Sequence, residues 1–261
     1  MLALAPPVLE IEDVHLAFGG VKALTGAGFA VREGELTALI GPNGSGKTSL
    51  LNCINGFYRP QRGAIRIFGN QVGSARSHEI ARWGVARTFQ NVEVLGSSTV
   101  IENVLLGRHI HIRQGMLASA IQVGRSAQEE RRNRDGAMEI LDFLGLSGHA
   151  DRNVGSLPYG TQKLVEIGRA LAMEPKLLLL DEPTSGMTPI EKTLVSDVIR
   201  RIRTEKGMTQ LLIEHDMGFI SNLCDRAVVL NMGAVIADAK PEDALSDPAV
   251  VSSYLGVEFA S

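Results

Sequence analysis

Near its N-terminus, the chain has the pattern of a buried strand that runs directly into a glycine-rich loop and then into a helix. The stretch 36–40, LTALI, is continuously apolar, which is typical of a strand covered on both faces. It is followed by GPNGSGKT at 41–48, which satisfies G-x-x-x-x-G-K-[ST] in full, and by a helical pattern that Gly56 ends. Motif and setting agree, so we interpret this loop as a phosphate-binding loop rather than a structural turn.

The loop offers a bound phosphate both backbone and side-chain groups. Its glycines let the backbone close around phosphate oxygens, and successive N–H groups at a helix N-terminus form an anion cradle. We expect Lys47 to reach the β- and γ-phosphates and the Thr48 hydroxyl to ligate Mg²⁺. The predicted nucleotide contacts of this segment are Gly41, Pro42, Asn43, Gly44, Ser45, Gly46, Lys47, Thr48 and Ser49.

A site of this kind also needs a carboxylate for its metal ion. In KLLLLDEP at 176–183, four apolar residues place Asp181 at the C-terminal end of a buried strand, where open α/β sheets bind their ligands. We interpret Asp181 as a metal partner and Glu182 as the base that polarises the attacking water. His215 follows another apolar strand and is a candidate for the γ-phosphate end of the site, although a histidine taken alone is more often structural.

Composition excludes several other classes of protein. A formal net charge of −3 does not supply the dense basic surface that nucleic-acid binding needs. No stretch approaches the roughly 20 apolar residues that span a bilayer, and MLALAPPVLEIED does not fit a signal peptide. Cys53 and Cys224 lie far apart in apolar stretches, as reduced core thiols do, and His109 and His111 lack further ligands at metal-binding spacing.

Strand and helix patterns alternate along most of the chain, which predicts a mostly parallel, three-layer sheet. Strands are expected at 8–18, 27–32, 36–40, 63–72, 176–183, 209–216 and 226–237, and a helix at 189–207. The strand in 63–72 is expected to end in a Gly-Asn turn. From about 75 to 155 the strand signals fade, and the charged, amphipathic stretch 125–146 indicates a helical subdomain inserted into the α/β core.

The stretch SLPYGTQKLVEIGRAL at 156–171 predicts a helix whose tip meets a ligand. Ser156 offers a capping hydroxyl, Pro158 suits a first turn, and Gly160 allows a close approach to the backbone. Apolar residues then recur at helical spacing, so the helix is expected to be half buried. Its charged residues are expected largely on the other, exposed side: Lys163, Glu166 and Arg169.

Taken together, the 41–48 loop, Gln90 in ARTFQN, LPYGTQ at 157–162, LLLLDEP and His215 resemble, in content and order, the ATP-binding subunits of ABC transporters. The resemblance covers nearly the whole chain. It implies one ABC ATPase domain over 1–261, with an α/β P-loop NTPase three-layer core, a mostly parallel sheet, an antiparallel β subdomain and an inserted helical subdomain at approximately 88–160. It implies ATP and Mg²⁺ as cofactors.

The same resemblance assigns roles to further residues. A lone phenylalanine after a strand is usually a core residue, but Phe18 lies 29 residues before Lys47, similar to the family's adenine-stacking aromatic, and the resemblance favours that role. His215 becomes the switch histidine that senses γ-phosphate, and Gln90 links the nucleotide and its metal to the membrane partner. The implied catalytic set is Lys47, Glu182 and His215, and the implied metal set is Thr48, Gln90 and Asp181.

In this family the tip of the 156–171 helix is the signature motif, which meets the γ-phosphate of ATP held by the other ATPase subunit. The resemblance therefore adds Tyr159, Gly160 and Thr161 to the nucleotide contacts. Two departures from the family pattern stand out. Pro158 replaces the serine whose hydroxyl would contact phosphate, which implies weaker closure, and Thr188 occupies the aspartate position of the D-loop, which leaves communication between the two sites open.

Within the family, LPYG, IEHDM and the closing DPAVVSSYLG look most like the ATPases of bacterial high-affinity branched-chain amino-acid importers. Urea importer and lipopolysaccharide-export ATPases share parts of this pattern. The resemblance implies integral-membrane permeases, a second ATPase subunit or a second copy of this chain, and indirectly a solute-binding protein as partners, at the cytoplasmic face of the membrane.

Other classes fit the sequence less well. A soluble ABC ATPase acting on ribosomes or DNA usually carries two cassettes or a long coiled-coil insert, and neither is visible. A GTPase switch needs an N-K-x-D segment, which the sequence lacks. A catalytically silent cassette is disfavoured by the Asp181–Glu182 pair.

Overall fold

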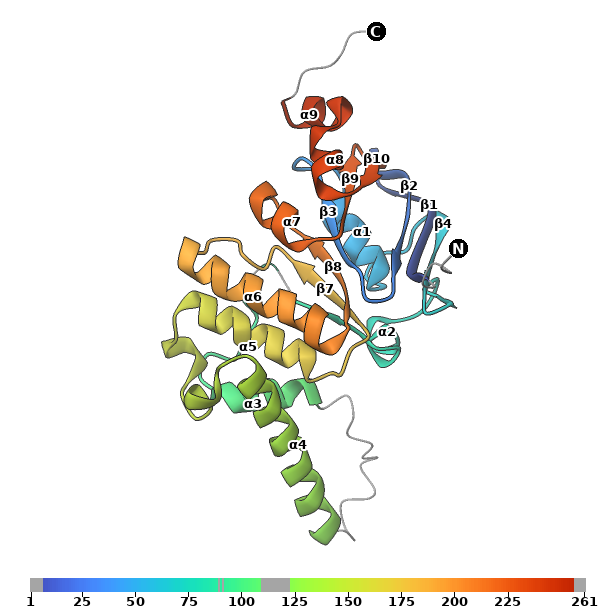
Figure 1. The fold of residues 1–261 in the computed structure, drawn as a ribbon. Coiled ribbons are helices and arrows are strands. Elements are labelled where there is room, and N and C mark those ends of the chain that lie inside the picture. Colours follow the sequence, from blue (N-terminus) through green and yellow to red (C-terminus); the bar gives the residue numbers. More distant parts are fainter. Residues whose placement is uncertain (1–6, 89, 91, 109–122, 256–261) are drawn as a thin grey trace, which may run out of the picture. The chain divides into compact units, whose positions relative to one another are not determined.

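The computed structural model describes residues 7–88, 90, 92–108 and 123–255 (Figure 1). His109 and His111 lie outside the described residues. The chain divides into two compact units, each described by itself. The first unit comprises Met1–Val85, Lys176–Pro183 and Ile199–Ser261, and the second comprises Ala86–Pro175 and Thr184–Val198.

The first unit is built on a mostly parallel sheet whose central strands are completely buried. The strand order is β10-β9-β3-β8-β7-β6, in which β3 runs parallel to β8 and β9, and β7 runs parallel to β8. Continuous apolar runs form these strands because both faces are covered. The strands are β3 (Leu36–Ile40), β6 (Val85–Arg87), β7 (Leu177–Asp181), β8 (Thr209–Ile213), β9 (Arg226–Asn231) and β10 (Ala234–Ala239). Strand β6 begins in the first unit and ends in the second.

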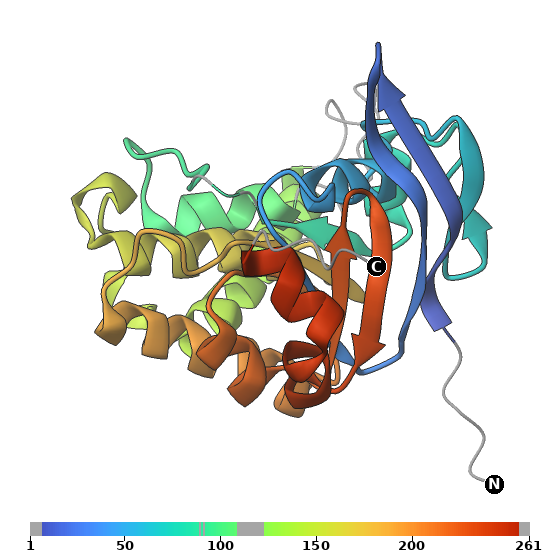
Figure 2. The same cartoon turned by 90° about the horizontal axis from the view of Figure 1, so that it is seen from above.

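A second, antiparallel sheet has the order β2-β1-β4-β5. Its strands are β1 (Pro7–Phe18), β2 (Val21–Arg32), β4 (Arg62–Ile67) and β5 (Asn70–Gln71). Helix α1 (Lys47–Ile54) lies between the two sheets in both views (Figures 1 and 2). Leu9 of β1, Leu39 of β3 and Ile54 of α1 belong to one buried apolar cluster, so a single core holds both sheets around the helix that follows the glycine-rich loop.

The 226–237 segment, predicted as a single strand, is the antiparallel hairpin β9–β10, with Met232 and Gly233 at φ 46° and 82°. The apolar pattern on either side concealed this turn. The 63–72 segment, predicted as a strand that ends in a Gly-Asn turn, is β4 and β5, separated by Phe68 and Gly69 at φ 50° and 76°. Both turns use left-handed backbone that glycine adopts readily. Strand β6 lies within the stretch in which strand signals fade, and three residues are too short a pattern to detect.

Helices occur in both units. Those of the first unit are α1, α2 (Ser77–Arg82), α7 (Met217–Leu223), α8 (Pro241–Ser246) and α9 (Pro248–Leu255). The second unit contains α3 (Val100–Arg108), α4 (Val123–Phe143), the short 3-10 turns Ser147–His149 and Val154–Ser156, and α5 (Tyr159–Leu171). Helix α6 (Pro189–Lys206) begins in the second unit and ends in the first. Within the described residues, no helix is long and apolar enough to cross a membrane.

Helix α5 is more deeply buried than its sequence indicates. Lys163 and Glu166 are each 1% exposed, and their side chains form an ion pair with Nζ and Oε2 2.9 Å apart. The prediction that these two charges lie on a solvated side was therefore wrong. Pairing at i, i+3 offsets the cost of removing both charges from water, and hydrophobic periodicity contains no sign of such a pair.

Candidate nucleotide site

The glycine-rich loop connects β3 to α1. At three of its positions the backbone has a conformation that only glycine adopts readily. Gly41, Gly44 and Gly46 have φ values of 148°, 80° and 107°. A Cβ on Gly41 would lie 2.0 Å from the carbonyl oxygen of Leu230, so the first loop residue must be glycine. Helix α1 follows with no side-chain cap, which leaves the N–H groups of its first turn for a ligand.

Lys47 is the first residue of α1, and its side chain folds back over the loop. Nζ donates hydrogen bonds to the carbonyl oxygens of Gly41 at 2.8 Å and Pro42 at 3.1 Å. Burial lowers the pKa of Lys47 below its ordinary value, and the nearby Glu182 and Asp181 carboxylates oppose that shift. An anionic ligand at the loop would favour the charged ammonium in the same way, so this environment suits a phosphate.

Other loop positions also fit a phosphate with its metal ion. The Ser45 hydroxyl is buried and has no hydrogen-bond partner within the described part of the chain, and such an orphaned oxygen normally finds one in a ligand or water. Thr48 lies in the first turn of α1 with its side chain exposed, as a metal-binding hydroxyl requires. Pro42, Asn43 and Ser49 occupy the positions predicted for them around this loop.

Two acidic residues end β7, as predicted, but their environments differ. Asp181 is buried at 5% exposure in the last position of the strand. Glu182 has left the strand conformation, with φ at 45°, and its N–H donates to the carbonyl of Ile213 at 3.0 Å. A non-glycine residue in this region costs about 1 kcal/mol or more, and such positions cluster at functional sites. The backbone thus turns Glu182 out of the sheet directly after the buried aspartate.

The Glu182 carboxylate meets His215. Oε1 of Glu182 and Nε2 of His215 are 2.7 Å apart, and the two side chains are 17% and 39% exposed. His215 lies just beyond β8, the strand that pairs with β7 in parallel, so the sheet itself brings the two residues together. The structure therefore joins Lys47, Asp181, Glu182 and His215 at the carboxyl end of one sheet, where α/β folds bind their ligands.

Phe18 is the last residue of β1, and its side chain is 47% exposed. Phe18 is therefore not a core residue. Its ring makes a T-shaped contact with Tyr58, with centroids 5.0 Å apart and planes at 71°. An exposed aromatic ring in the same unit as the phosphate loop is available to stack on a base.

In the second unit, the predicted signature residues stand at the start of α5. Tyr159 and Gly160 begin the helix after Pro158, and Thr161 follows, half buried. Ser156 does not cap this helix, because its hydroxyl donates to the carbonyl of Asn153 at 2.8 Å. The Glu191 carboxylate accepts the Gly160 N–H instead, at 2.9 Å. Gln90 is exposed in the same unit, and its contact with the metal stays a prediction.

Sequence reasoning missed two residues of these sites. Glu191 gave no signal because its partner Gly160 is distant in sequence, although T-P-I-E at 188–191 has the spacing of a capping box. Tyr254 of α9 forms a hydrogen bond with the Gly41 backbone that opposes the rise in its pKa caused by burial. The sequence of this segment carries only a resemblance to importer ATPases and no sign of a contact with the loop.

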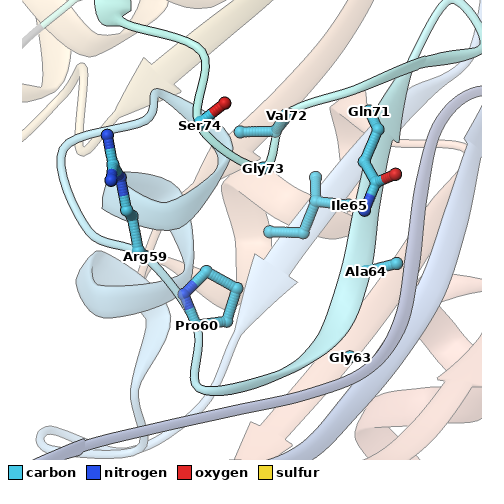
Figure 3. Close-up of a pocket in the computed structure, with 9 residues that line it drawn as sticks. All are labelled: Arg59, Pro60, Gly63, Ala64, Ile65, Gln71, Val72, Gly73 and Ser74. Carbon is cyan, nitrogen blue, oxygen red and sulfur yellow. The ribbon is translucent and has the colours of Figure 1, made fainter.

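A surface pocket of about 340 Å³ lies elsewhere in the first unit, between β4, β5 and the segment after α1 (Figure 3). None of the predicted site residues lines it. Its lining residues are Arg59, Pro60, Gly63, Ala64, Ile65, Gln71, Val72, Gly73 and Ser74.

A model of the ABC transporter family matches residues 24–185. The chain belongs to this family. The protein is thus an ATPase whose ATP hydrolysis is coupled to transport, and ATPases of this family work with membrane permease components. The family match confirms the predicted fold class and enzyme class.

The ABC ATPase is similar to the following relatives over 89% or more of its length. The high-affinity branched-chain amino acid transport ATP-binding protein BraF of Pseudomonas aeruginosa is 39% identical over 250 residues, covering 96% of this chain and 98% of BraF. MJ1267, an ATP-binding cassette of an ABC transporter, is 36% identical in sequence to this chain. The crystal structure of its ADP conformation superposes on the fold with a TM-score of 0.84, over 97% of this chain and all of MJ1267. The ATP-binding cassette MJ0796, a dimer bound to ADP and Pi in a post-hydrolysis state, is 25% identical with a TM-score of 0.73, covering 89% and 98% of the two chains.

Proposed function

We propose that this ATPase powers the import of branched-chain amino acids through partner permeases in the membrane. The observation that carries this proposal is the similarity to BraF, a high-affinity branched-chain amino acid transport protein by name, at 39% identity over nearly the full length of both chains. The ATPase itself binds nucleotide and partner proteins and not the transported solute, so the substrate of the transporter is inferred through this relative.

In the proposed mechanism, the adenine of ATP stacks on Phe18 and the triphosphate lies in the 41–48 loop. The loop N–H groups and the Lys47 ammonium bind the β- and γ-phosphates. Thr48 and Asp181, together with Gln90, would hold Mg²⁺, which neutralises charge on the β- and γ-phosphate oxygens when bound. The buried carboxylate of Asp181 and the exposed hydroxyl of Thr48 are the oxygen ligands that Mg²⁺ prefers.

Glu182 acts as the base in this mechanism. Its carboxylate orients the attacking water and polarises it toward the γ-phosphorus. The 2.7 Å contact with His215 fixes the position of Oε1 and so orients the carboxylate. His215 also reports whether γ-phosphate is present, because a histidine beside both the base and the phosphate has different hydrogen-bond partners before and after hydrolysis.

The proposal includes a second ATPase subunit, either a related chain or a second copy of this one. The signature residues Tyr159, Gly160 and Thr161 of one subunit would bind the γ-phosphate held by the other, and the dimer of MJ0796 supports such pairing. ATP then favours the closed dimer by its higher affinity for that state, and hydrolysis opens it. The subunit would act at the cytoplasmic face of the membrane, with a solute-binding protein as an indirect partner.

The test is to isolate the ATPase from its own cells with its membrane partners and to reconstitute the complex in vesicles that contain ATP. We expect multi-span permeases to co-purify, and external leucine, isoleucine or valine to accumulate inside when the cognate binding protein is supplied. Uptake of urea, or extraction of lipopolysaccharide, without amino-acid uptake would contradict the proposed solute. Failure to recover any membrane protein would contradict the transporter assignment of this chain.

A further inference from the structure

The aromatic ring that is proposed to stack on adenine is held by the chain segment that follows α1. Phe18 ends β1, and the next residue, Gly19, lies in a turn where an added Cβ would meet nothing within 4 Å. A ring at the tip of such a hairpin needs support from elsewhere to keep one orientation. Tyr58 supplies one contact, because its ring meets that of Phe18 in a T-shaped pair with centroids 5.0 Å apart.

Gln61 supplies a second support, through the backbone beside Phe18. Its side-chain Oε1 accepts the Ala17 N–H and its Nε2 donates to the Ala17 carbonyl, both at 2.9 Å. The backbone N–H of Gln61 also donates to the carbonyl of His15 at 2.9 Å. The register of β1 with β4 ends at His15. The Gln61 amide makes the two hydrogen bonds to Ala17 that a backbone group of a neighbouring strand would otherwise make, and Ala17 is the residue next to Phe18.

The same segment is fastened to the helix that carries the phosphate loop. The N–H groups of Phe57 and Tyr58 both donate to the carbonyl of Asn52 in α1, at 2.9 and 3.2 Å. Helix α1 begins at Lys47, so backbone hydrogen bonds fasten the segment of Tyr58 to the helix that begins at this lysine, and the ring contact of Tyr58 connects it to Phe18. The ring remains 47% exposed and Tyr58 37% exposed, which leaves room for a base at this surface.

We propose that Tyr58 and Gln61 are positioning residues for the nucleotide base, which hold the Phe18 ring at a fixed place relative to the phosphate loop. This inference rests on the proposed stacking of adenine on Phe18. Preorganisation of the ring lowers the entropy lost on binding, so the two residues should raise affinity for the base without acting on the phosphates. They should therefore change ATP binding and leave the chemical step unchanged.

The test compares ATP with inorganic tripolyphosphate, which has the phosphates but no base, on the purified full-length ATPase. We expect Tyr58→Ala and Gln61→Ala each to weaken ATP binding about three- to tenfold and to raise KM with kcat retained. Tripolyphosphate affinity should stay unchanged, and Tyr58→Phe should behave as wild type because it keeps the ring. Phe57→Ala is the matched control, since it removes a 56% exposed ring from the same segment.

A double-mutant cycle with Phe18→Ala distinguishes a failure of the proposed stacking from a failure of the proposed positioning role. Phe18→Ala should weaken ATP but not tripolyphosphate, and adding Tyr58→Ala to it should weaken ATP no further. If Phe18→Ala leaves ATP affinity intact, the proposed stacking itself is wrong. If Phe18→Ala weakens ATP but Tyr58→Ala and Gln61→Ala do not, or if the double variant loses more than Phe18→Ala alone, the positioning role is overturned. Thermal unfolding of each variant checks that the fold is retained.

Discussion

The N–H of Gly160 donates a 2.9 Å hydrogen bond to Oε1 of Glu191, joining the N-terminus of α5 to that of α6. The other carboxylate oxygen of Glu191 accepts the N–H of Thr188 at 3.0 Å and its hydroxyl at 2.8 Å. A Cβ on Gly160 would lie 2.8 Å from Cβ and Cγ of Glu191, so the carboxylate occupies the space directly beside this glycine. An acidic side chain thus holds the amide that the signature role assigns to a γ-phosphate.

Removing the charge of Glu191 is therefore expected to favour the ATP-bound dimer. The hydrogen bond from Gly160 and those from Thr188 lower the pKa of Glu191, so the side chain is anionic at neutral pH and competes with phosphate for one N–H. In a Glu182→Gln background, Glu191→Gln should reduce the ATP concentration that gives half-maximal dimer, measured by light scattering.

Glu102→Gln is the matched control for this experiment. Glu102 forms the same kind of capping box with Thr99 at the start of α3, with Oε2 2.7 Å from the Thr99 N–H. The Glu102→Gln variant should leave the dimer equilibrium unchanged. Weaker dimerisation of Glu191→Gln than of the background would show instead that the carboxylate supports the closed state.

ATP affinity is expected to fall at alkaline pH through Lys47. Burial lowers the pKa of this lysine below 10.5 in the free protein, whereas a bound triphosphate favours the ammonium and raises the pKa again. ATP binding should therefore take up a proton over the range between the two pKa values, and affinity should decline as pH rises through the lower one. Calorimetry in two buffers of different ionisation enthalpy, repeated at a series of rising pH values, measures the uptake. Equal heats in both buffers would contradict it.

Neither cysteine should react with thiol reagents in the folded protein. Burial raises the pKa of Cys53 to about 11, and it raises that of Cys224 further, with the neighbouring Asp225 adding to the shift. At pH 8 the thiolate fraction of Cys53 is then about one in a thousand, and both side chains are buried. A chromogenic disulfide should label both residues only after denaturation. Rapid labelling of the native protein would show that one of these core regions opens easily.

Much of the nucleotide site could be predicted from the sequence because its signals are local. Residues 36–48 combine an apolar run with a glycine spacing, and Asp181 and Glu182 follow directly on another apolar run, so neighbouring letters specify both the strand and the chemistry. The parallel pairing of β7 with β8 then brings His215 to Glu182, which the order of strands and helices already favoured.

The sequence-based predictions failed where the outcome depends on contacts with elements distant in sequence. Ser156 has the local pattern of a cap, but Glu191, 31 positions after Gly160, caps α5. Lys163 and Glu166 have the pattern of a solvated face, but tertiary packing buries them as a pair. Gln61 has no pattern at all, and only the folded antiparallel sheet places its amide against Ala17. Local propensity does not encode such contacts, because they depend on which elements pack together.

The proposed mechanism requires Glu182 as the base of the ATP-hydrolysing site, and the Glu182→Gln variant tests this role. The substitution keeps the size of the side chain and an oxygen to face His215, but removes the basic carboxylate. We expect ATP affinity to be retained while single-turnover hydrolysis falls on the order of 10²-fold or more, with an ATP-bound dimer accumulating. Wild-type turnover by Glu182→Gln would contradict the assignment of the base and the mechanism built on it.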